Sequence, residues 1–102
     1  MEGRVEEIAV MIDESEDRFE NRMLKFSRGD LAVIKTMMNV VYQDLVTRKN
    51  MVLQSDSLSE EEKTDVAKDV YAELIKIERK VGLIEKREKS LAITVFDSPN
   101  HK

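Results

Sequence analysis

The stretch AKDVYAELIKIERKVGLIEKREKSLAITV, residues 67–95, decides the fold class. Apolar residues recur in it at the alternating three- and four-residue spacing of a heptad repeat, at eight of nine positions. Such spacing places one apolar seam along the side of an α-helix. The segment is therefore predicted to be one long helix. The nine seam positions are Ala67, Val70, Leu74, Ile77, Val81, Ile84, Glu88, Leu91 and Val95.

The same repeat extends towards the N-terminus and predicts an all-α domain over residues 1–96. It is apolar at five of seven positions in residues 5–26 and at six of seven in residues 31–52. Helix breakers are rare, since the chain has three Gly and one Pro, and this favours long helices. We expect helices over residues 4–27, 30–54 and 59–96, followed by a flexible tail over 97–102.

The expected helix boundaries coincide with residues that cap helices. Gly29 is suited to end the first helix, and Asp30 to cap the second. Ser59 and Glu62 have the spacing of a capping box at the start of the third helix. Short connections favour antiparallel neighbours, so the expected architecture is a three-helix bundle or a helical hairpin with a long C-terminal helix.

The last helix is too long for a compact domain of this size. A helix over 59–96 would measure about 55 Å at 1.5 Å per residue, whereas a compact 100-residue domain is about 34 Å across. Either the chain bends at Gly82 and folds back, or a second copy covers the part that extends beyond the bundle. The seam stays in phase through Gly82, which favours the second copy and a coiled-coil-like dimer contact. The predicted self-association residues are Val70, Leu74, Ile77, Val81, Ile84, Leu91 and Val95.

Charge is distributed unevenly along the chain, whose net charge is −4. Residues 51–75 carry −5 and residues 76–102 carry +3. The helix dipole alone accounts for such a distribution, but it also suits an antiparallel homodimer in which acidic and basic halves of the last helix meet. Nucleic-acid binding by the basic half is an alternative that we do not favour, because Glu78, Glu85 and Glu88 interrupt the basic cluster and repel phosphates.

The chain offers little for catalysis. It has no Cys, and its one histidine, His101, lies in the expected tail. The acid pairs Glu14 with Asp17 and Glu62 with Asp65 have the helical spacing at which carboxylates hold magnesium in all-α nucleotide hydrolases, but such pairs are common in acidic helices. We therefore assign no catalytic, cofactor-binding or metal-binding residue and expect no cofactor. A carboxylate-metal nucleotide hydrolase is a distant third hypothesis for the function, after an interaction module and nucleic-acid binding.

No apolar run approaches the length of a membrane-spanning helix. Residues 1–20 hold eight acids and two bases, which is unlike a secretory signal, and a chain without Cys fits a reducing compartment. These features together predict a cytoplasmic protein.

Methionines are concentrated on the expected middle helix. Met is an adaptable core residue that also occurs on surfaces that bind varied partners. Val33, Met37 and Val40 would form a docking strip for a protein partner if the neighbouring helices leave them open. The sequence therefore favours a small non-catalytic interaction module, an adaptor, chaperone or regulator that binds an unidentified protein through helix faces, as a homodimer.

Overall fold

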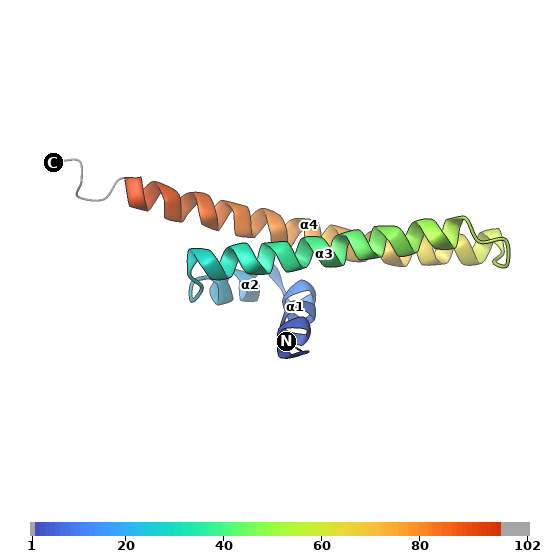
Figure 1. Ribbon diagram of the computed structural model, residues 1–102, viewed down its shortest axis with the longest axis horizontal. Helices are drawn as coiled ribbons and strands as arrows, with labels where there is room; N and C mark the ends of the chain where they lie inside the picture. The colour runs from blue at the N-terminus through green and yellow to red at the C-terminus, as the bar shows by residue number, and fades with distance from the viewer. Residues whose placement is uncertain (1, 97–102) are drawn as a thin grey trace.

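The computed structural model describes the backbone of residues 2–96 and the side chains of residues 6–92. The described backbone forms helices and no strands, which confirms the all-α prediction (Figure 1). The expected tail at 97–102 and His101 lie outside the described residues. The helices are α1 (Glu2–Asp13), α2 (Glu16–Met23), α3 (Arg28–Leu53) and α4 (Glu60–Phe96).

The long helices α3 and α4 lie side by side as an antiparallel hairpin, and α1 and α2 pack against it (Figure 1). The molecule is elongated, with extents of 67 × 26 × 23 Å. A compact chain of this length has a radius of gyration of about 13 Å, whereas this one has 17.5 Å. The elongation arises because α1 and α2 flank only part of the hairpin.

The expected single helix over 4–27 is wrong, because the chain breaks between α1 and α2. Ser15 has an extended backbone, with φ −62° and ψ 156°, and its hydroxyl accepts a hydrogen bond from the Arg18 amide at 3.3 Å. A serine in this conformation starts a new helix rather than continuing the previous one. Glu16 and Asp17 then lie at the positive end of the α2 dipole, so local chemistry at Ser15 overrides the heptad seam.

The start of α3 also differs from expectation. Ser27, not Asp30, is the N-cap, and the two residues form a reciprocal capping box with both hydrogen bonds at 3.1 Å. Gly29 is therefore inside the first turn of α3, and it does not have a positive φ. The expected Gly29 helix end and Asp30 cap are wrong because Ser27 offers the same chemistry three residues earlier.

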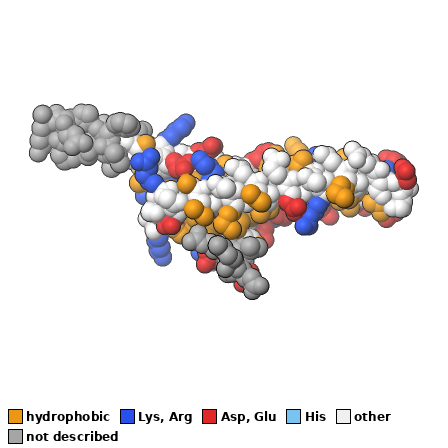
Figure 2. All heavy atoms as spheres, in the orientation of Figure 1, with side chains coloured by type: hydrophobic (Ala, Val, Ile, Leu, Met, Phe, Trp, Pro, Cys, Tyr) orange, Lys and Arg blue, Asp and Glu red, His pale blue; other side chains and the backbone are white. Residues whose placement is uncertain are grey.

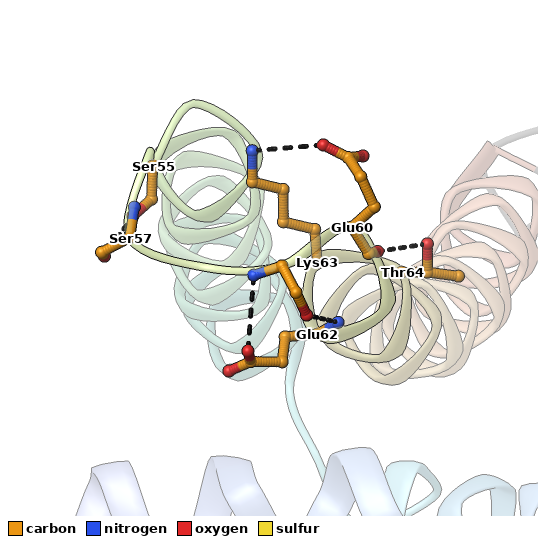
Figure 3. A network of polar contacts seen from close by, with 7 residues as sticks. Ser55, Ser57, Glu60, Glu62, Lys63 and Thr64 are labelled. Carbon is orange, nitrogen blue, oxygen red and sulfur yellow. Dashed lines mark hydrogen bonds and ion pairs between the residues drawn. The ribbon is translucent and has the colours of Figure 1, made fainter.

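The capping box predicted for the last helix is confirmed. The Glu62 amide donates to the Ser59 hydroxyl at 3.1 Å, and the Ser59 amide donates to the Glu62 carboxylate at 3.4 Å (Figure 3). In the preceding turn the hydroxyls of Ser55 and Ser57 lie 2.9 Å apart. These local bonds fix the turn between α3 and α4.

The hydrophobic core lies where all four helices meet. On the hairpin, its buried side chains come only from residues 31–38 of α3 and 77–84 of α4 within the described part of the chain. Phe19, Leu31, Met38 and Ile84 have no exposed side-chain surface. The other buried members of this cluster are Ile8, Met11, Ile12, Met23, Ile34 and Ile77.

The helix α4 continues through Gly82 without a bend, as the in-phase seam indicates. The expectation that the residues after Gly82 lack a facing helix is wrong for those with described side chains. Ile84 is fully buried, and Leu83 and Leu91 pack against the core. The helices that cover this part of α4 are α2 and the first turns of α3. For example, Lys35 Nζ of α3 donates to the Glu88 carboxylate at 2.7 Å.

Candidate protein-binding groove

An apolar groove lies between α1 and α3 on the described surface. Its volume is about 460 Å³, and Asp13 and Glu73 are the charged residues in its lining. One wall comes from α1 and the other from α3, with α4 reaching its edge. The apolar lining residues are Ile8, Ala9, Ile12, Met37, Val40, Val41 and Leu45.

The wall formed by α1 is held in place by basic side chains of α4. Lys80 is 4% exposed, and its Nζ donates to the Ile12 carbonyl at 3.3 Å. Lys76 Nζ lies 3.5 Å from the Asp13 carboxylate. Since a cation near a helix C-terminus interacts favourably with the last carbonyls, these lysines hold the end of α1 against α4.

The corner between α1 and α2 is closed by a bidentate ion pair. The Arg22 guanidinium donates to both oxygens of Glu14, from Nε at 2.8 Å and from Nη2 at 3.0 Å. This hydrogen bonding raises the pKa of Arg22 above its ordinary value. Arg79 of α4 adds a longer ion pair with Glu16, at 3.7 Å. Because charged groups of α2, α4 and the connection between α1 and α2 hold the corner, the direction in which α1 leaves the hairpin is fixed.

The predicted docking strip lies on or beside this groove. Met37 and Val40 line it, and Val40 is 63% exposed. Val33, one turn before Met37, is also open to solvent, with an exposed fraction of 44%. Figure 2 shows hydrophobic side chains gathered over the middle of α3. Val33 and Val40 are therefore left open by the neighbouring helices, whereas Met37 is half-buried and also packs against the core.

The structure adds to this strip residues that the sequence placed in the packing seams. Ile8, Ile12 and Leu45 occupy heptad positions, and residues at such positions usually pack between helices. Because the chain breaks at Ser15, α1 diverges from the hairpin. Ile8, Ile12 and Leu45 therefore also line the groove. Ser15 is the sequence signal for this arrangement, as a cap residue followed by two acids.

The predicted self-association seam is divided by the fold. Leu74, Ile77 and Ile84 are 5%, 1% and 0% exposed within the single chain. They cover the chain's own core, so they do not form an open contact surface. Val70, Val81 and Leu91 are half-buried, and the side chain of Val95 lies outside the described side chains.

Towards the turn between α3 and α4, the hairpin extends beyond the hydrophobic core and the groove. We call residues 46–53 of α3 and 60–72 of α4 the distal half of the hairpin. None of its described side chains is fully buried. Met51, Leu53 and Tyr71 are 67%, 44% and 62% exposed. The distal half is thus a layer of two helices with apolar side chains open to solvent.

Several charges of the basic half of α4 are engaged inside the molecule. Besides its contact with Asp13, Lys76 Nζ lies 3.1 Å from Glu73, and this hydrogen bond raises the pKa of Lys76. Lys80 is buried, with Nζ 5.8 Å from the centre of the Phe19 ring. In the alternative of nucleic-acid binding by this half, Lys76 and Lys80 would have to leave these contacts to bind phosphates.

The acid pairs do not assemble a metal site in the described part of the chain. No cluster of three or more His, Asp or Glu side chains suited to a metal ion occurs among the described residues. Glu14 is bound to Arg22, and Glu62 caps α4. The spacing that suggested magnesium binding is explained by these structural contacts.

Comparison with protein-family models, curated proteins and solved structures found no match to this chain. Among the helices of residues 2–96, none has a segment whose length and apolarity would let it cross a lipid bilayer.

Proposed function

We propose that this chain is a small non-catalytic interaction module that binds a helix of a protein partner in the groove between α1 and α3. The observation that carries the proposal is an open groove lined by seven apolar residues from two helices. Exposed apolar surfaces of this kind mark interaction sites, and helical walls suit the helix-in-groove mode of recognition. Met37 supports the proposal, because a methionine side chain adapts its shape to a bound partner.

Within this class, we propose an adaptor, chaperone or regulator that acts in the cytoplasm. Nucleic-acid binding by the basic half of α4 has less support, because Lys76 and Lys80 are held by contacts within the chain. A carboxylate-metal hydrolase has less support still, because Glu14 and Glu62 have structural partners.

Site-specific photo-crosslinking in the native host tests the groove. A crosslinking amino acid at Val40 lies in the groove, whereas one at Val10 is similarly exposed, at 54%, but is absent from the groove lining. We expect Val40 to give a discrete crosslinked partner that Val10 does not give. No adduct at Val40, or the same adducts at both positions, would contradict the proposal.

Self-association is a second proposal, and the distal half of the hairpin favours it. Two copies that pair through their distal halves would place four helices around a shared apolar interior. Met51, Leu53 and Tyr71 would then be covered. We expect sedimentation at high micromolar concentration to show a dimer that Met51→Lys dissociates. A monomer at all concentrations would reject this proposal without affecting the groove.

A further inference from the structure

The helix α1 and the first part of α4 are acidic. The sequence of α1 has four acids and one base, and residues 60–73 of α4 have six acids and two lysines. Between them, on α3, Asp44 and Arg48 pair with each other at 3.0 Å. The apolar lining of the groove is thus bordered by Asp13 of the acidic helix α1 and by Glu73 of α4.

At the groove edge, the three carboxylates of Asp13, Asp69 and Glu73 face two ammonium groups, those of Lys76 and Lys80. Lys76 Nζ serves two carboxylates, Asp13 at 3.5 Å and Glu73 at 3.1 Å. Lys80, whose Nζ binds the neighbouring Ile12 carbonyl, is the second cation at this edge. Asp69, one turn before Glu73 on α4, is exposed and makes the net charge of the edge negative. Charge complementarity across an interface selects the partner and its orientation.

We infer that the occupant of the groove is a cationic amphipathic helix of a protein partner. This inference rests on the proposed function and adds the chemistry of the partner. The apolar face of the helix would lie against Ile12, Val40 and Leu45. Lysine or arginine side chains on its flank would reach Asp13 and Glu73.

A second copy of this chain fits the groove less well. The chain has a net charge of −4, so two copies repel each other at long range. Lys80 is buried and Lys35 is bound to Glu88. These two cations are therefore engaged within their own chain.

Three synthetic peptides test the inference with the full chain. Each is a helix of about 18 residues with the same apolar face, and the flanking positions are Lys, Gln or Glu. We expect calorimetry at low salt to show about tenfold tighter binding of the Lys peptide than of the Gln peptide, and the weakest binding for the Glu peptide. The difference between the Lys and Gln peptides should shrink as salt is added.

Two variants with a matched control locate the effect. Glu73→Gln should weaken the Lys peptide about two- to fivefold and leave the Gln peptide unchanged. Asp56→Asn, an equal change of charge in the exposed loop between α3 and α4, should leave both peptides unchanged. Val40→Asn should weaken both peptides, because it removes apolar contact in the groove.

The outcomes separate the two proposals. If the Lys and Gln peptides bind equally and Val40→Asn weakens both, the groove is a docking site and the inferred positive charge of its partner is wrong. If Val40→Asn changes neither, peptide binding does not use the groove and both proposals are overturned. If Glu73→Gln and Asp56→Asn weaken the Lys peptide equally, the charge effect is not local and the inference fails.

Discussion

The Nζ atom of Lys80, on α4, donates a hydrogen bond to the backbone carbonyl of Ile12 at the end of α1. The carbonyl lies next to the Ser15 break, where α1 stops and the regular helical hydrogen bonds end. The lysine is almost completely buried, and it connects the core of the hairpin to the wall of the groove. The position of α1, and with it the shape of the groove, therefore depends on this contact.

Lys80→Met should loosen α1. The substitution keeps most of the side-chain volume but leaves the buried Ile12 carbonyl without its donor, a loss of about 1–3 kcal/mol. Removing a buried ammonium group offsets part of this loss, so we expect about 1 kcal/mol of destabilisation in urea unfolding. Hydrogen exchange should accelerate in α1 before it does in α3 and α4. The matched variant Lys86→Met, at an exposed site, should alter neither, and equal effects of the two would contradict this role.

Gly82→Ala should stabilise the protein. Gly82 lies inside α4 without a positive φ, and a Cβ added there would meet nothing within 4 Å. Alanine is favoured over glycine in a helix interior by about 0.5–1 kcal/mol. Thermal or urea unfolding should show a gain of this size. A loss of stability would indicate that the chain bends at Gly82.

Ile84→Ala should destabilise the single chain. Its side chain is fully buried, and removing such a group costs about 2–5 kcal/mol, including the cavity left behind. Leu24→Ala, at a site that is 62% exposed, should cost less than about 0.5 kcal/mol. Denaturant unfolding at two protein concentrations checks this. An Ile84→Ala effect that appears only at high concentration would place Ile84 in a contact between copies.

The ion pair of Lys35 with Glu88 should produce a pH-dependent stability term. Hydrogen bonding to the Glu88 carboxylate raises the pKa of Lys35 above its ordinary value. The contribution is therefore complete below the unfolded-state pKa, about 10.5, and is lost as the pH rises through the higher folded-state value.

Unfolding of Lys35→Met as a function of pH measures this contribution. At pH 8 we expect this variant to be less stable than the parent by about 0.5–1 kcal/mol, since both groups of the pair are part-exposed. The difference should shrink in alkaline solution. Lys68→Met, at an exposed position, should show no such trend, and a Lys35→Met difference that is independent of pH would contradict the assignment.

The helices were predictable from the sequence to the extent that they depend on periodicity and capping. The α4 seam and the Ser59 cap are local signals, and both lead to the structure observed. Ser15 and Ser27 carry the same kind of capping signal. Ser15 also occupies a polar position in the heptad repeat of residues 5–26, and that repeat predicted one continuous helix. At Ser15 local capping competes with long-range periodicity, and capping prevailed. At Ser27 two possible caps compete, and the earlier one prevailed.

The groove was predictable only in part. Val33, Met37 and Val40 are apolar residues at helical spacing, and the sequence identified them as a possible open strip. Whether they are covered depends on the direction of α1, which is set by Lys76 and Lys80 from more than 60 residues away along the chain. Contacts at that separation leave no local pattern in the sequence.

Methyl NMR of the full chain, titrated with the Lys-flanked amphipathic peptide, tests the central claim most directly. If the groove binds the helix, shift changes should be concentrated at the methyl groups of Ile8, Ile12, Val40 and Leu45. The methyl groups of Leu24, on the α2 side of the molecule, should keep their positions. Changes centred on Leu24, or spread evenly over all methyl groups, would contradict the assignment of the groove as the binding surface.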